Sequence, residues 1–86
     1  MVAKLVERVN EKIAEEELLV IGVKHVGLCE MNAVIPDKIK TDEKGIHIEG
    51  ENLMLDITNE EKYEVFFNET EDKFIIKHGA ATYHLS

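Results

Sequence analysis

Residues 45–57, GIHIEGENLMLDI, decide how this chain folds. In both halves of the stretch, branched apolar residues recur at every second position, which is the period of a β-strand with one buried face. Gly50, Glu51 and Asn52 separate the halves and are typical turn residues. The stretch therefore predicts a β-hairpin. Its core-facing residues are Ile46, Ile48, Leu53, Leu55 and Ile57, and its outward residues are His47, Glu49, Met54 and Asp56.

The C-terminal third contains two further strand-like runs, 63–67 (YEVFF) and 73–77 (KFIIK). Their aromatic and β-branched content and the polar loop between them predict a second hairpin. Its outward residues would be Glu64, Phe66, Lys73, Ile75 and Lys77. A helix from Asn59 to about Glu69 is the competing interpretation, because the aromatic residues also have helical spacing. Residues 58–61 (TNEE) fit a capping box, so one helical turn is expected there. Gly79 marks a bend before a last strand over 81–85.

The N-terminal segment has the period of an amphipathic helix. Five apolar residues lie within an arc of about 100° on a helical wheel: Val2, Leu5, Val6, Val9 and Ile13. The apolar block 18–23 (LLVIGV) is typical of a strand buried on both faces. Residues 26–35 predict an irregular second strand, because Gly27, Asn32 and Pro36 interrupt the pattern. Residues 37–44 are expected to form a polar connection.

These elements predict one α+β domain over residues 1–86, with the N-terminal amphipathic helix packed on a mostly antiparallel β-sheet of four to six strands. Eighty-six residues leave no room for a second domain. Three Phe, two Tyr and no Trp imply an aliphatic core, so a homodimer would add useful buried area.

The net charge of −8 lies in one window of the chain. Residues 49–72 contain nine acids and one base, whereas the remaining nine acids are matched by nine bases. A local anionic surface attracts cationic partners and repels nucleic acid and anionic membranes. The partner-binding residues expected from this window are Glu49, Met54, Asp56, Glu60, Glu61, Glu64, Phe66, Glu69, Glu71 and Asp72. The alternative is that the charges are only solvated and that the apolar members are covered within a dimer.

No motif in the sequence points to catalysis, a metal or a cofactor. Cys29 and the four histidines lack the paired spacing of a zinc site, and no phosphate-binding glycine loop is present. Cys29 with a nearby histidine is the only candidate nucleophile–base pair. The basic cluster Lys38, Lys40 and Lys44 is interleaved with acids and has no aromatic stacking partner, which disfavours direct nucleic-acid binding.

A single cysteine, the lack of a signal-like N-terminus and the shortness of the apolar runs predict a cytoplasmic protein that does not enter a membrane. The sequence favours a small acidic non-enzymatic binding protein. The most specific version of this prediction is an inhibitor or regulator that occludes the basic, nucleic-acid-binding surface of a protein partner. The alternative is a structural or adaptor subunit of an intracellular or phage assembly that acts through self-association. A small enzyme or metal protein centred on Cys29 is the third interpretation.

Overall fold

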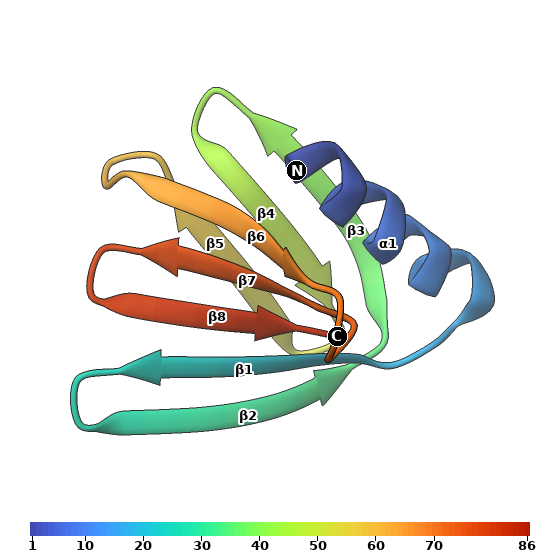
Figure 1. The fold of residues 1–86 in the computed structure, drawn as a ribbon. Helices are drawn as coiled ribbons and strands as arrows, with labels where there is room; N and C mark the ends of the chain where they lie inside the picture. The colour runs from blue at the N-terminus through green and yellow to red at the C-terminus, as the bar shows by residue number, and fades with distance from the viewer.

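The chain folds into one helix and eight strands in an α+β arrangement, seen in a computed structural model that describes residues 1–86 (Figure 1). The elements are α1 (Val2–Glu15), β1 (Leu19–His25), β2 (Leu28–Val34), β3 (Pro36–Asp42), β4 (Gly45–Gly50), β5 (Leu53–Thr58), β6 (Tyr63–Asn68), β7 (Lys73–His78) and β8 (Ala81–Leu85). The strands form two antiparallel sheets. Sheet A has the order β2-β1-β8-β7-β6, and sheet B has the order β3-β4-β5.

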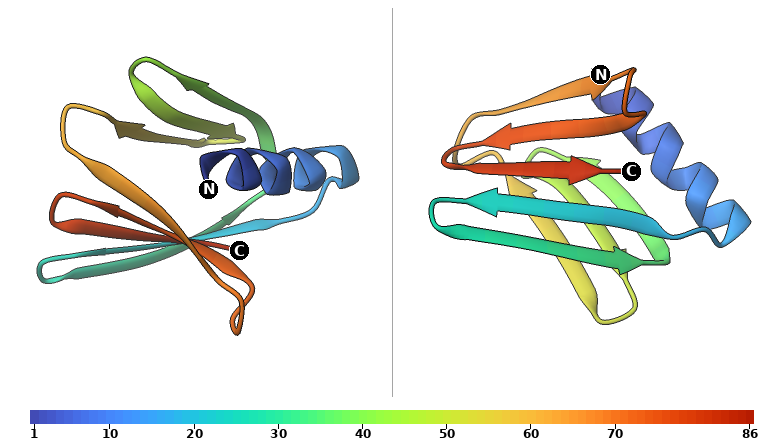
Figure 2. Two further views of the ribbon diagram at one scale, coloured as in Figure 1. Left: turned by 45° about the horizontal axis from the view of Figure 1, so that its top comes forward. Right: turned by 60° about the horizontal axis from the view of Figure 1, so that its bottom comes forward.

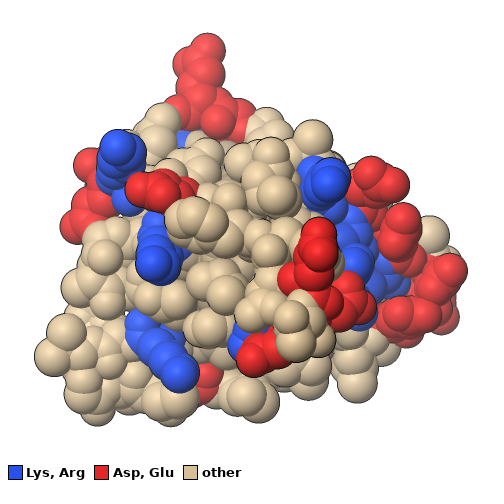
Figure 3. All heavy atoms as spheres, in the orientation of Figure 1, with Lys and Arg blue, Asp and Glu red and all other residues tan.

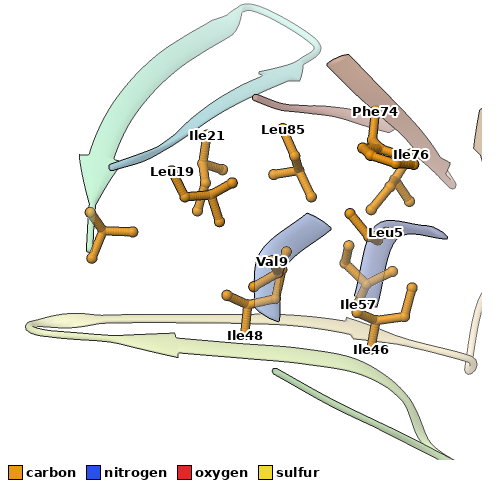
Figure 4. Packing of buried hydrophobic residues seen from close by; sticks show 11 residues of the cluster. Leu5, Val9, Leu19, Ile21, Ile46, Ile48, Ile57, Phe74, Ile76 and Leu85 are labelled. Atoms are coloured by element: carbon orange, nitrogen blue, oxygen red, sulfur yellow. The ribbon is translucent and has the colours of Figure 1, made fainter. Parts of the chain in front are cut away.

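The two sheets and the helix enclose one aliphatic core. Figure 2 shows α1 in the opening between the sheets, at one side of the molecule. Leu5 and Val9 of α1 are fully buried and project between Leu19, Leu85 and Ile76 of sheet A and the isoleucines of sheet B (Figure 4). The predicted amphipathic helix is therefore confirmed, and its apolar stripe joins two layers rather than lying across one sheet.

Both predicted hairpins are confirmed. β4 pairs with β5 so that Ile46, Ile48 and Ile57 are buried while His47, Glu49 and Asp56 point outward. β6 pairs with β7, which excludes the competing helix over 59–69. The expected last strand is β8, and Gly79 lies in the turn before it with φ +57°.

The expected sheet of four to six strands is too small, because residues 37–44 were expected to be a polar connection and instead contribute most of β3. This strand lies at the edge of sheet B, where Ile39 is its main inward side chain. A lysine-rich edge strand needs little apolar surface, so its sequence resembles a loop. Pro36 begins the strand next to a register shift, a position that tolerates a missing N–H.

Three further expectations were wrong in detail. β1 is buried on one face only: Leu19 and Ile21 are buried, whereas Lys24 is exposed. β2 is regular rather than irregular, since it pairs with β1 over its whole length and Gly27 lies in the turn. Residues 58–61 form no helical turn. The backbone N–H of Asn59 donates instead to Lys44 O at 2.8 Å, and its side-chain amide donates to Glu43 O, which ties the end of β5 to the β3–β4 turn.

The end of α1 has an unusual cap. Glu16 adopts the left-handed conformation (φ 54°, ψ 40°), and the N–H of Glu17 donates to Lys12 O at 2.9 Å. This is the geometry that glycine usually supplies. The ammonium of Lys12 also donates to Leu18 O at 3.1 Å and lies beside the helix C-terminus, where a cation is favourable.

Candidate functional site

The two sheets differ sharply in their outward-facing side chains. Because the inward residues of both sheets share one core, the outward residues face opposite sides of the molecule. The outer face of sheet B is charged in the manner expected of a solvated sheet. Cross-strand register places Lys38 opposite Glu49, and Lys40, His47 and Asp56 in one row.

His47 lies at the centre of a hydrogen-bonded charge network on that face. Its Nδ1 lies 2.6 Å from Asp56 Oδ1, and its Nε2 lies 3.2 Å from Asp42 Oδ1. The hydrogen bond with Asp56, followed by that with Asp42, raises the pKa of His47 above its ordinary value. The backbone N–H of Lys44 donates to Asp42, and this bond is the main reason that the pKa of Asp42 is lowered. With a carboxylate on each ring nitrogen, His47 bridges charges within the sheet and has no free nitrogen to act as a base.

The outer face of sheet A carries a row of mainly apolar residues. Gly22 of β1 pairs with Met31 of β2 on one side and with His84 of β8 on the other. Ile75 of β7 continues the row beside His84, and Phe66 of the edge strand β6 ends it. We call these five residues the outer row. Met31 is 76% exposed and Phe66 is 42% exposed, and the three residues between them are half-buried, so the row is accessible mainly at its two ends.

Three lysines border the outer row. Lys24, Lys73 and Lys77 point to the same side of sheet A, because they alternate with buried residues of β1 and β7. The ammonium of Lys77 lies 5.4 Å from the centre of the Phe66 ring, and that of Lys73 lies 2.5 Å from Glu71 Oε2. In Figure 3 the lower left of the molecule, over the strands of sheet A, is largely uncharged with isolated basic groups, while acidic groups gather at the right over the helix.

A hollow of about 210 Å³ interrupts the outer row at Gly22, where no side chain fills the surface. Met31, Cys29, Lys24, Lys73 and His84 contribute to its lining. The Nδ1 atom of His84 is buried without a hydrogen-bond partner. Desolvation, followed by the charges of Lys73 and Lys24, lowers the pKa of His84 below its ordinary value. The imidazole of His84 thus lies in a depression whose lining also includes the charged residues Lys24, Glu30 and Lys73.

β2 extends past the core as an edge strand. Six of its seven residues are exposed, and only Val34 is buried. Its extensive contacts are with β1 alone. Leu28 is 54% exposed, and Val26 in the adjoining turn is 84% exposed. The strand contains no proline or lysine and has a single charge, Glu30, so it lacks most of the features that protect edge strands.

The structure does not gather the residues of the acidic window on one face. Glu49, Met54 and Asp56 lie on the outer face of sheet B. The other predicted residues belong to sheet A and its turns: Glu60 and Glu61 before β6, Glu64 and Phe66 within it, and Glu69, Glu71 and Asp72 after it. The two turns lie at opposite ends of a six-residue strand, roughly 20 Å apart.

Three of the predicted carboxylates are already engaged within the chain. Asp56 bonds His47, Glu71 pairs with Lys73, and Asp72 accepts a hydrogen bond of 2.9 Å from Arg8 of α1. The guanidinium of Arg8 also lies over the rings of Phe67 and Phe74, 5.8 and 5.6 Å from their centres. Asp72 therefore helps to hold α1 against sheet A through Arg8.

Sequence reasoning missed most of the outer row. Phe66 and Ile75 were predicted as outward residues, but Met31, Gly22 and His84 were not grouped with them, because the β1–β8 pairing joins residues about sixty positions apart. One available signal was the glycine inside a strand-like apolar block, which often marks a close approach or an open surface position.

The other residues considered as catalytic or metal-ligating candidates do not form a common site. Cys29 is exposed on β2. His78 Nε2 lies 2.7 Å from Thr58 O and helps to position the β5–β6 connection. No group of three or more His, Cys, Asp or Glu side chains has a geometry that could hold a metal ion. The single helix is too short and too polar to cross a bilayer.

Comparison of the chain with protein-family models, curated proteins and solved structures found no match. Its function is therefore inferred from the outer face of sheet A and from the charges described above.

Proposed function

We propose that this chain is a non-enzymatic protein-binding domain that docks a protein partner on the outer face of sheet A. The observation that carries the proposal is the outer row, a mainly apolar row with exposed ends at Met31 and Phe66 across a face that alternation should make polar. Sheet B provides the internal comparison, because Lys40, Asp42, His47 and Asp56 on its outer face are paired with one another.

The hollow at Gly22 and the surrounding lysines define the chemistry of the partner. A depression of about 210 Å³ has room for an apolar side chain but is small for a drug-sized ligand. Carboxylates beside that side chain would meet Lys24 and Lys77, which form no ion pair within the chain, whereas Lys73 is already paired with Glu71. We therefore propose a partner segment that inserts one apolar residue and carries acids on either side, with the aromatic ring of Phe66 at the rim of the contact.

The acidic inhibitor predicted from the sequence is the second candidate. Glu60, Glu61 and Glu64 are exposed and form no ion pair within the chain, so one end of β6 offers unpaired negative charge. That surface suits a basic protein, for example the nucleic-acid-binding surface of an enzyme, and repels nucleic acid itself. It is smaller than the full acidic window, which is divided between the two sheets.

Affinity capture with matched variants separates the two candidates. Gly22→Val fills the hollow, and its added Cβ would lie 3.7 Å from His84 Cβ, an ordinary contact, so the fold should tolerate it. Met31→Ser removes an exposed apolar side chain from the outer row, and Met54→Ser makes the same change on the opposite face. The triple variant Glu60→Lys, Glu61→Lys, Glu64→Lys raises the formal net charge from −8 to −2, since each reversal adds two.

The immobilised variants would be exposed to a lysate of the native host, and the retained proteins would be identified by mass spectrometry. The sheet A proposal expects a protein that the wild type and Met54→Ser retain and that Gly22→Val and Met31→Ser lose. A protein lost only by the triple charge reversal, with binding that weakens as salt rises, would favour the acidic candidate. A partner retained equally by all variants would refute both surfaces.

A further inference from the structure

We infer that the free edge of β2 pairs antiparallel with β2 of a second copy of this chain, about a two-fold axis at Met31. The inference rests on the proposed function in one respect, because the same pairing would join the outer rows of two copies. The evidence for it is separate, however, and comes from the backbone of β2.

The hydrogen-bond pattern identifies which backbone groups of β2 are free. Val20 and Ser86 exchange hydrogen bonds of 2.7 and 3.0 Å, so the N–H and C=O of Val20 point toward β8. Backbone groups alternate sides along a strand, so the N–H and C=O groups of the next residues in the alternation point toward β2. These residues are Leu19, Ile21, Val23 and His25. The β1–β2 register pairs them with Leu28, Glu30, Asn32 and Val34, whose backbone groups therefore hydrogen-bond to β1. Cys29, Met31 and Ala33 are left with three donors and three acceptors that point away from the sheet.

A two-fold pairing at Met31 satisfies all of these groups. Met31 would face Met31 of the second copy, and Cys29 would face Ala33, which gives six hydrogen bonds across the axis. The registers centred on Glu30 and on Asn32 would each bond only two of the three residues, Cys29 with Met31 or Met31 with Ala33, which gives four hydrogen bonds instead of six. The register centred on Glu30 would also place the two Glu30 carboxylates opposite each other. The number of hydrogen bonds among the free residues of β2 therefore selects Met31 as the centre, and charge repulsion further disfavours Glu30.

The same register accounts for the exposed apolar residues near β2. Leu28 would lie opposite Val34 of the second copy, and Val26 would come near the Ile35–Pro36 segment. Val26, Leu28, Met31 and Ile35 are all exposed in the single chain, and all would lie at or beside the junction. The two outer rows would then run as one stripe across ten strands, with the two Met31 side chains adjacent at the axis.

Cysteine cross-linking tests the register. In a hydrogen-bonded antiparallel pair the Cα atoms lie about 5.5 Å apart, within the range of a disulfide. Met31→Cys in a Cys29→Ser background should therefore form a covalent dimer under mild oxidation. The wild type is the control, because the two Cys29 residues would be roughly 14 Å apart along the strands and should not cross-link. A wild-type cross-link together with an unlinked Met31→Cys variant would refute the register.

Sedimentation from low micromolar to near-millimolar concentration tests the pairing itself. Ala33→Pro removes an N–H that points to solvent in the single chain, so the fold should survive and the dimer should be lost. Circular dichroism of Ala33→Pro checks that survival. Asn32→Lys and Asn32→Glu form a matched pair, because residue 32 would face Glu30 of the second copy. Lysine should tighten the dimer and glutamate should weaken it, each by roughly twofold to thirtyfold in Kd.

A wild type that stays monomeric at every concentration, with no cross-link through Met31→Cys, would overturn the inference. Loss of a partner protein by Ala33→Pro in a chain that is always monomeric would also overturn it, since the edge would then accept a strand of the partner. The proposed docking on sheet A would remain testable in either case, because Gly22→Val changes the face and leaves the β2 edge intact.

Discussion

Truncation of a buried helix residue, Leu5→Ala, tests whether α1 joins the two sheets. Leu5 is fully buried and lies in the core cluster contributed by both layers. Such substitutions of buried leucines cost about 2–5 kcal/mol, so we expect about 3 kcal/mol. Chains of this length are stable by about 4–13 kcal/mol, and the melting temperature should fall by roughly 12–24 °C.

Two substitutions on the same helix serve as graded controls. Ile13 is half-buried, so Ile13→Ala should cost about half as much as Leu5→Ala. Glu11 is exposed, and Glu11→Ala should change stability by no more than about 0.5 kcal/mol. Thermal and urea denaturation at one fixed protein concentration would measure the series, since association would shift the midpoints. Equal shifts for Leu5→Ala and Glu11→Ala would refute the docking of α1 between the sheets.

Three further predictions concern the backbone and the histidines. Glu16→Gly should stabilise the chain by up to about 1 kcal/mol in urea denaturation, because Glu16 has φ 54°; a loss of stability would contradict this reading of the helix end. Gly45→Ala should destabilise by more than about 2 kcal/mol, since the added Cβ would lie 2.0 Å from Ile57 O at φ 134°; a neutral effect would contradict the tight β4–β5 contact. Because its pKa is raised, protonated His47 stabilises the fold below about pH 6.5, and this contribution is lost as pH rises through the pKa of the folded state. Because the pKa of His84 is lowered, the effect of pH is the opposite, and stability is lost as pH falls below about 6.5. The melting difference between wild type and His47→Gln should therefore be larger at acidic than at alkaline pH, and that for His84→Gln should be smaller; the reverse order would refute the assignments.

Local patterns determined the elements whose evidence lies within a few residues. The alternation in residues 45–57 was enough to predict β4, β5 and their outward side chains. The apolar stripe of residues 2–13 was enough to predict α1 and its buried face. In each case the period of the apolar residues matches the geometry of one element, so no distant contact is needed to interpret it. The same holds for β6 and β7, where side-chain type distinguished strand from helix.

Only the tertiary structure decided how these elements combine. The division into two sheets depends on the β1–β8 pairing, which joins the first strand of the chain to the last. No local period in the sequence encodes such a pairing. That division sends Met54 and Phe66 to opposite faces, although both lie in one acidic stretch of sequence. It also brings Met31, Gly22 and His84 into one row. The physical reason is that strands pair wherever the whole core is best buried, so a surface assembled from five strands exists only after the sheet has formed.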